Sequence, residues 1–461
     1  MFFHARFLLF LFLTATLLFS YSVAASEKES ALEKDSSPDA LSINEKTESK
    51  ADSFFIPRRK EQFSRIPAYL FLPIPYSIPG VGKGLLGLGL VSNINGSQID
   101  AGALMLGGDA EGRGAGLLDI DILPESLKSD FNEAIVLDIF QFEIDKIGVK
   151  WFSVREMEGD KDDYYYVKIQ NILFQGGQLV ISFFDRRLEL IIQRGEGHAE
   201  LKAVLDSDGN TIVEADDPEP TDFVQTTYGF ILDLTDDKLD PRKGFRLGVN
   251  RDDSPESNEG EVSYRVMDYN VTGYIPIGVQ SSWVFNFFRS DSHVLSQGET
   301  DRAKIAQNLG LYCELIADTQ KREECIVTRK VVVDNYQAGN TYGTASSLGG
   351  SQRLRAYPTI RFRAAHTQML GTELRFNLAE EYTPFNIGIM SDIRTNIQLS
   401  TFYEIGTAAD RQEDLWKETR SSYGVGIRIV AGSGIVYRVD VAQGDEGTEF
   451  TAIINYPWGI F

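Results

Sequence analysis

The sequence predicts an all-β fold, a transmembrane antiparallel β-barrel, and three observations lead to it. Apolar residues alternate with polar or small residues along most of the chain after Gly80, the N-terminus has the layout of an export signal, and the last strand-like segment ends in Phe461. Alternation of this kind is the strand period. In a membrane barrel it places one face of each strand against lipid and the other toward a polar lumen.

The alternation is clearest near the C-terminus. In SYGVGIRIV the large apolar residues share one strand face and Arg428 falls on the other, and in GIVYRVDVA Arg438 and Asp440 share a face. Charges on a continuous face suit the lumen of a barrel, whereas a soluble sandwich buries the inner faces of both sheets. Strand-like segments number about 16 to 18. The first is Gly82–Ile94 and the last is Glu449–Tyr456.

The chain divides into four predicted segments. Residues 1–25 hold one cation, an apolar run and small residues up to Ala25, which predicts a cleavable export signal; a membrane anchor is the alternative. Residues 26–53 are hydrophilic and predict a disordered acidic linker. Residues 54–79 are rich in proline and predict a periplasmic leader or a plug segment. Residues 80–461 form the predicted barrel.

The net charge limits the classes of binding partner, and the cysteine content predicts a disulfide. The chain has 45 Lys and Arg against 67 Asp and Glu, a net charge of −22, which argues against nucleic acid because phosphate contacts need clustered cations. Cys313 and Cys325 are the two cysteines. In an exported chain they predict one disulfide that closes a surface loop, with two free thiols as the alternative.

Enzymatic and metal sites are not predicted. Ser292 lies beside His293, but no nucleophile elbow or spacing separates them from ordinary polar residues. Asp206, Asp208 and Asn210 suggest a calcium loop only superficially, because the closing glutamate of that motif is missing and an acidic turn explains them. We therefore expect no catalytic residues, no cofactor and no metal.

A family resemblance emerges in the last third of the chain. The segments GGSQRLRAY, GTELRFNL, TFYEIG and SYGVGIRI resemble the C-terminal half of the bacterial surface-antigen superfamily of outer-membrane assembly factors (BamA/TamA-like). The resemblance is good over Asp222–Phe461 and weaker over Gly80–Glu200. It implies a barrel of 16 strands in the bacterial outer membrane, with one long extracellular loop folded back inside.

The family's loop motif is Val-Arg-Gly-Tyr or Val-Arg-Gly-Phe, and here it reads Leu354-Arg355-Ala356-Tyr357. Alanine in place of glycine is a departure, which indicates either that this backbone position does not need a positive φ or that the loop tip is remodelled. Gly349 and Gly350 precede the motif and are predicted to form its hinge.

The family's partner motif, Phe-x-Asp-x-Gly, appears as Phe402, Glu404 and Gly406. Alternation directs all three into the lumen, where a buried guanidinium needs a fixed acceptor. We therefore predict that Arg355 pairs with Glu404. This pair either only staples the loop to the wall or also acts in transport.

Other inward groups extend this prediction. Glu373 and Arg375 also point inward by alternation and are predicted to join the same polar network. Three further arginines of the loop segment either line the lumen or meet lipopolysaccharide phosphates: Arg353, Arg361 and Arg363.

The resemblance also implies a function. Residues 26–79 are too few for even one periplasmic transport-associated (POTRA) domain, so the chain resembles the short members that lack them. We expect a role in inserting or translocating protein or lipid through a weak seam between Gly82–Ile94 and Glu449–Tyr456. The alternative is a passive channel or a structural surface antigen with a plugged lumen.

Partners follow from the same reading. They are expected to be outer-membrane lipid and lipopolysaccharide, the outer-membrane assembly machinery and a separate periplasmic subunit. The terminal strand carries aromatic residues predicted to form the signal that the assembly machinery reads: Phe450, Tyr456 and Phe461.

Overall fold

The structure is a computed structural model. It describes residues 55–59, 68–129, 132–215, 218–254, 262–278, 280–308, 312–315, 317–380, 385–387, 390–393, 395–431 and 436–459. The predicted export signal, the predicted linker and Phe461 lie outside the described residues.

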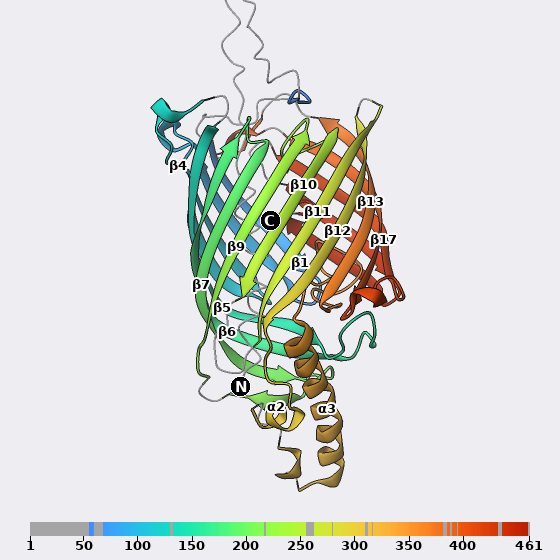
Figure 1. Ribbon diagram of the computed structural model, residues 1–461. Coiled ribbons are helices and arrows are strands. Elements are labelled where there is room, and N and C mark those ends of the chain that lie inside the picture. Colours follow the sequence, from blue (N-terminus) through green and yellow to red (C-terminus); the bar gives the residue numbers. More distant parts are fainter. Residues whose placement is uncertain are drawn as a thin grey trace, which may run out of the picture.

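An antiparallel barrel of 16 strands makes up the fold (Figure 1). The first eight wall strands are β1 (Ala68–Ile78), β2 (Gly82–Ser92), β3 (Asp100–Gly108), β4 (Glu111–Asp121), β5 (Asn132–Phe152), β6 (Tyr164–Phe183), β7 (Leu188–Leu205) and β9 (Thr221–Thr235). The second eight are β10 (Gly244–Ser254), β11 (Ser263–Ile277), β12 (Ser281–Ser296), β13 (His366–Glu380), β16 (Thr395–Ala409), β17 (Arg420–Ala431), β18 (Val436–Gly444) and β19 (Gly447–Ile454). Strand β8 (Thr211–Glu214) pairs with β7 outside this ring.

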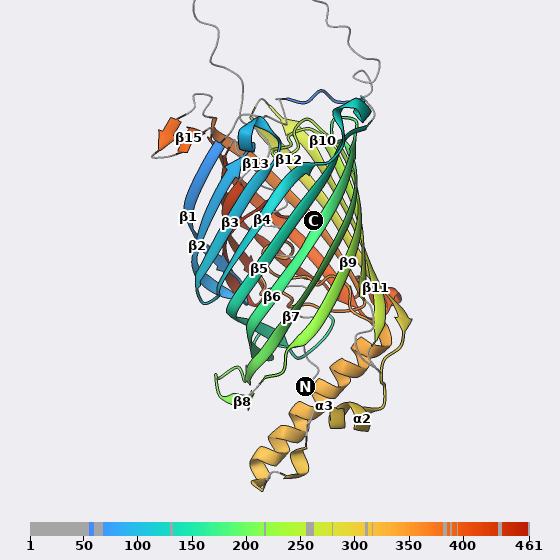
Figure 2. The ribbon, with the colours of Figure 1, turned by 90° about the vertical axis from the view of Figure 1, so that its left-hand side faces the viewer.

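The two ends of the barrel differ. Helices α2 (Arg302–Asn308) and α3 (Thr319–Tyr342) lie beyond the strands at one end (Figure 1), which we call the helix end. The opposite end, the turn end, has mostly short connections and the hairpin of β14 (Phe385–Ile387) and β15 (Met390–Ile393) (Figure 2). Short periplasmic turns and longer extracellular loops are the rule for outer-membrane barrels, so the turn end corresponds to the periplasm.

Helical structure is limited among the described residues. Besides α2 and α3, four single turns of 3₁₀-helix occur: η1 (Ile94–Gly96), η2 (Glu125–Leu127), η3 (Cys313–Leu315) and η4 (Gln412–Asp414). None of the described helices combines the length and apolarity needed to cross a membrane.

The predicted disulfide is confirmed. Cys313 in η3 is bonded to Cys325 in α3, with the two Cα atoms 5.6 Å apart. Beside it, a hydrogen bond from Arg329 lowers the pKa of Glu314 below its ordinary value. The disulfide and this ion pair tie the helical segment together outside the barrel wall.

Strand boundaries correct part of the sequence analysis. The predicted first strand, Gly82–Ile94, is the second strand of the wall, because β1 pairs with β2 along its whole length from Ala68 to Ile78. The barrel therefore begins inside the segment 54–79 that was predicted as leader or plug. Pro73 and Pro75 made this segment look unlike a strand. Proline has no backbone N–H to donate to a neighbouring strand, so it is tolerated at a strand edge that is not paired there.

The other end of the wall also differs from expectation. β19 ends at Ile454, two residues before the predicted end at Tyr456. In the middle of the chain, β5, β6 and β7 are 21, 20 and 18 residues long. These three strands reach past their neighbours at the helix end (Figure 1).

The outer surface of the wall is apolar, as a lipid-facing surface requires. Exposed outward side chains include Tyr69, Leu85, Met105, Phe285 and Ile427. Alternate residues of the same strands are buried and point inward. The inward face is not uniform, since it is apolar along the first strands and charged along the last ones.

Candidate functional site: an arginine loop held inside the barrel

The connection from β12 to β13 re-enters the barrel between Gly343 and Ala365. Its two arms run side by side: Leu348 and Phe362 form an antiparallel bridge, and the Gly350 N–H donates to the Tyr357 carbonyl over 2.8 Å. Gly349 has φ +105°, and a Cβ there would lie 2.2 Å from the Pro358 carbonyl oxygen. Glycine is therefore required at this position for the arms to approach each other.

Arg355 at the loop tip is fully buried and is held by three carboxylates from three strands. Its Nε donates to Glu404 on β16 over 3.0 Å, and its backbone N–H donates to the same carboxylate over 2.9 Å. Nη1 donates to Asp440 on β18 over 3.0 Å, and Nη2 donates to Glu373 on β13 over 3.2 Å. The structure thus brings Arg355 and Glu404 together and adds Asp440, which the sequence analysis placed in the lumen without a partner.

Three wall arginines complete this cluster. Glu373 also accepts from Arg375 over 2.7 Å and from Arg428 over 2.6 Å. Arg438 forms an ion pair with Asp440 and donates to the Ser351 carbonyl of the loop. Four guanidinium groups therefore face three carboxylates in a region shielded from water, where each charge depends on its partners.

Side chains around the cluster fit the loop to the wall. The guanidinium of Arg355 lies 3.3 Å from the centre of the Phe402 ring. Gly406 leaves room for the loop, because a Cβ there would lie 2.8 Å from Leu348 Cδ1. The Tyr357 hydroxyl donates to the Ser421 carbonyl over 3.1 Å, and Ala356 does not have a positive φ. Alanine is therefore compatible with the backbone at the position where the family has glycine.

The other loop arginines also lie inside. Arg361 forms an ion pair with Glu446 over 2.6 Å and Arg363 stacks on Trp151 with its guanidinium 3.7 Å from the ring centre. The guanidinium of Arg353 lies 3.6 Å from the centre of the Phe288 ring. These contacts favour the lumen over the alternative in which the three arginines meet lipopolysaccharide.

The C-terminal tail was missed by the sequence analysis. After β19 the chain leaves the wall and enters the lumen, where the Trp458 indole N–H donates to Glu404 over 2.7 Å and Asn270 donates to the Trp458 carbonyl over 3.0 Å. The Gly459 N–H donates to Gln352 of the loop over 3.1 Å. The tail is thus a second inward element that clasps the loop. Of the predicted assembly signal, Phe450 faces outward and Tyr456 faces inward.

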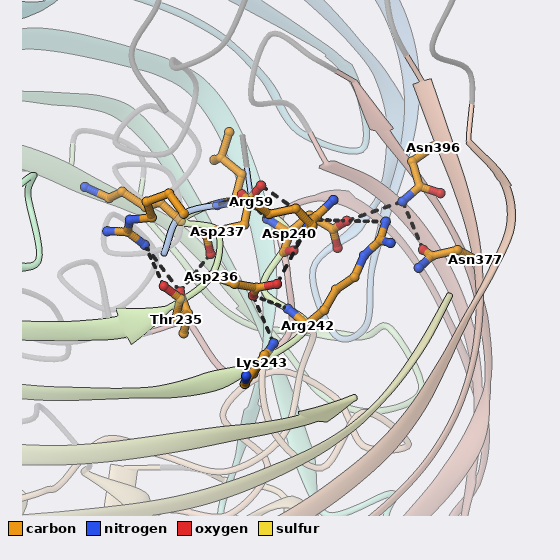
Figure 3. A network of polar contacts seen from close by, with 12 residues as sticks. Arg59, Thr235, Asp236, Asp237, Asp240, Arg242, Lys243, Asn377 and Asn396 are labelled. Carbon is orange, nitrogen blue, oxygen red and sulfur yellow. Dashed lines mark hydrogen bonds and ion pairs between the residues drawn. The ribbon is translucent and has the colours of Figure 1, made fainter. Parts of the chain in front are cut away.

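A second polar network centres on Asp240 (Figure 3). Asp240, in the connection between β9 and β10, accepts hydrogen bonds from Arg59 before the barrel and from Asn396 and Gln398 on β16. The Tyr456 hydroxyl of the tail donates to the same carboxylate over 3.2 Å. One aspartate therefore joins the residues before β1, a turn-end connection, the wall and the tail.

Other side chains that could serve in a catalytic or metal site form structural contacts instead. Asp291 receives Arg289 over 2.6 Å and lies 2.8 Å from His366 Nδ1. His293 stands opposite Arg265 in the pairing of β11 with β12. Within the described ranges no group of His, Cys, Asp or Glu is arranged to hold a metal ion.

The fold and the loop together define a class: an outer-membrane β-barrel that holds an arginine-bearing loop inside its lumen. The family model described as the Omp85 superfamily domain matches residues 146–443. The chain belongs to the Omp85 superfamily and is a bacterial outer-membrane protein. No curated protein sequence matches the chain.

Similar solved structures are distant in sequence. BamA from Haemophilus ducreyi lacking POTRA domains 1–3 is 11% identical, with 85% of this chain and 76% of that chain covered and a TM-score of 0.45. CdiB from Escherichia coli is 11% identical, with 87% and 64% covered and a TM-score of 0.46. OccK8 (OprE) from Pseudomonas aeruginosa is 10% identical, with 85% and 97% covered and a TM-score of 0.27.

Proposed function

We propose that this barrel inserts or translocates protein strands or lipid at the outer membrane, by opening between β1 and β19. The observation that carries the proposal is the pairing at this seam. β1 and β19 are registered at a single residue pair, Ser77 with Ala452. By contrast, β1 pairs with β2 from Ala68 to Ile78, and β18 pairs with β19 from Tyr437 to Gly444.

The tail bears directly on this seam. Because paired strands are antiparallel, continuing the register of Ser77 with Ala452 would set residue 74 opposite 455 and residue 70 opposite 459. The described residues of the tail therefore reach far enough to pair with the edge of β1 from residue 76 to residue 70. Instead Trp458 bonds to Glu404 in the lumen. Pro73, Pro75 and Pro457 lack N–H donors, which weakens a closed ladder at this place.

The loop and the tail act as a plug that keeps the lumen blocked when the barrel opens. The loop is fastened to β13, β16 and β18 through Arg355, and the tail to β16 and β18. Near β1 the loop bonds to the turn that follows the strand, where the Thr359 N–H donates to the Pro79 carbonyl. A seam can then open while the lumen stays plugged. The alternative function, a passive channel, predicts a stable ion conductance for the wild-type protein in planar bilayers, whereas a plugged assembly factor predicts only brief and irregular openings.

A disulfide across the seam tests the proposal. Ser77→Cys with Ala452→Cys joins directly opposed residues and should abolish complementation of a deletion strain, scored by outer-membrane permeability to a large antibiotic. A reductant should restore it. The matched control is Val439→Cys with Ala452→Cys, across the continuous β18–β19 ladder. Full complementation by the oxidised seam variant would rule out lateral opening.

Partners belong to the same proposal. The outer-membrane assembly machinery would insert the barrel, and a separate periplasmic subunit would bring cargo to the turn end. Arg59 and Asp240 lie at that end (Figure 3). Lipopolysaccharide would surround the helix end.

A further inference from the structure

The residues just before the barrel form a strap across its turn end (Figure 2). This strap, residues 55–59, is attached to β9 and to the connection that follows it. Arg58 donates to Asp233 over 3.4 Å, and the Arg59 N–H donates to the Asp236 carbonyl over 2.6 Å. β9 is the eighth of the 16 wall strands, so these contacts lie half a turn around the barrel from β1. Since the strap precedes β1 in the chain, the segment that leads into β1 is fixed to the opposite wall.

The side chain of Arg59 joins the strap to a buried aspartate, Asp240 (Figure 3). Its Nη2 donates to the Asp240 carbonyl over 2.7 Å and to the carboxylate over 3.3 Å. Asp240 is 3% exposed, and its carboxylate also accepts from Gln398 over 2.6 Å and from the Tyr456 hydroxyl over 3.2 Å. Gln398 lies on β16, and Tyr456 lies in the tail after β19. We call these four residues the latch.

The latch connects the two sides of the seam. One side is β1 with the strap before it. The other side is β19 with its tail, together with β16, which is joined to β19 through the continuous ladders of β17 and β18. Removing a cation from a buried carboxylate is costly. Movement of the strap away from Asp240 is therefore opposed.

The latch lies where the seam has little strand pairing. Because the strap leads into β1, this strand begins at the turn end, and its registered pair with β19, Ser77 with Ala452, is near its other end. The Tyr437 hydroxyl donates to the Pro75 carbonyl over 3.1 Å beside that pair, and β15 lies against β1. At the turn end the latch supplies a connection across the seam that the backbone ladder does not.

We propose that the latch holds the seam closed and that the barrel opens when the strap leaves Asp240; this inference rests on the proposed opening between β1 and β19. Asp240 acts on the two edge strands through the strap and the tail, so it is a positioning residue. When the strap leaves, the Trp458 indole keeps its hydrogen bond to Glu404 and the lumen stays plugged. Because the turn end corresponds to the periplasm, opening is controlled from the periplasmic side.

Spin labels on the two edge strands test the proposal in the full chain. Phe71→Cys on β1 and Phe450→Cys on β19 replace outward side chains that are 57% and 50% exposed, and the two native cysteines stay unlabelled in their disulfide. Pulsed electron paramagnetic resonance in lipid nanodiscs measures the ratio of long to short distances, which reports open and closed seams. We expect Arg59→Ala to raise this ratio about fivefold, the upper range for a partly exposed ion pair. Heat-modifiable gel mobility confirms that each variant is folded.

A matched control and a combined variant separate the latch from general stability. Arg242 donates to the same Asp240 carboxylate over 3.3 Å but lies in the same connection, so Arg242→Ala should keep the ratio within about twofold of wild type. Gln398→Leu with Tyr456→Phe removes the other side of the latch at similar volume and should also raise the ratio about fivefold. Adding Arg59→Ala to that pair should raise it no further, because both changes break one series of contacts.

The outcomes separate this proposal from the opening of the seam. A wild-type ratio in Arg59→Ala, an equal rise in Arg242→Ala, or a multiplied effect in the combined variant would overturn the latch whatever the seam disulfide shows. Full complementation by the oxidised Ser77→Cys, Ala452→Cys variant, together with the expected ratios, would refute opening as the function but keep the latch as a restraint on β1. Loss of complementation together with the expected ratios supports both proposals.

Discussion

The two halves of the inner wall share one backbone geometry and differ in almost everything else. Strands β13, β16, β17 and β18 direct arginines and carboxylates inward and hold the loop and the tail through them. Strands β1, β2 and β3 direct leucines inward. The fold therefore does not determine the character of the lumen. The charged contacts to the loop come from β13, β16 and β18, whereas near β1 and β2 the loop bonds through the Thr359 N–H to the Pro79 carbonyl.

The largest expected effect comes from removing the central cation of the charged half. Arg355→Ala removes the one guanidinium that donates to all three buried carboxylates, Glu373, Glu404 and Asp440. Breaking such a buried network costs about 3–5 kcal/mol. We expect a loss of this size in the free energy of unfolding, measured by urea titration in vesicles and by heat-modifiable gel mobility.

A control and a double variant sharpen this prediction. Arg113→Ala removes an exposed ion pair with Glu143, and exposed pairs contribute at most about 1 kcal/mol. Arg355→Ala combined with Glu404→Ala should be no worse than Arg355→Ala alone, because the cation and one of its acceptors leave together. Strictly additive losses would show that the two side chains do not act as one unit.

Removing the tail's indole should have the next largest effect. Trp458→Ala deletes the hydrogen bond to Glu404 and a buried ring, and truncation of a buried tryptophan costs about 3 kcal/mol or more. Gly371→Ala approaches the same contact from the wall, because its Cβ would lie 2.7 Å from the indole ring. Crowding of this kind costs about 1–3 kcal/mol. Unchanged urea midpoints for both variants would mean that the tail does not occupy the lumen.

The smallest effect on the barrel is expected at the helix end. Cys313→Ser with Cys325→Ser removes a disulfide that lies entirely within the helical segment. We predict faster proteolysis within residues 302–342, while the free energy of unfolding of the barrel, measured by urea titration, changes by less than about 0.5 kcal/mol, as for changes far from a core. A large drop in barrel stability would show that the helices support the wall.

The inward orientation of charged side chains could be predicted where strand alternation and the position of charged residues agree. Glu404 was placed in the lumen by strand alternation, and the loop motif supplied Arg355 as a cation that needs a buried acceptor. Alternation also placed Glu373 and Arg375 inward, where the structure has them. These predictions rest on a strand period that tertiary contacts do not change.

The failures have physical causes as well. β1 was missed because Pro73 and Pro75 make a strand interior improbable, unless one edge of that strand has few hydrogen-bonded partners. The sparse pairing of this edge is visible only in the folded barrel. The tail was assigned to the last strand as far as Tyr456, since alternation continues there. Its departure from the wall depends on a contact between Trp458 and Glu404, residues 54 positions apart. No local pattern carries that information.

Amide hydrogen exchange of the full chain in lipid nanodiscs tests the central claim most directly, that β1 is weakly paired at the seam while β16 and β17 are continuously paired. Local opening shows as fast exchange. The account predicts that residues 68–76 of β1 exchange at least tenfold faster than β16 and β17, and that Arg355→Ala removes protection from the loop without changing β1. Equal protection of β1 and β16 in the wild-type protein would contradict it.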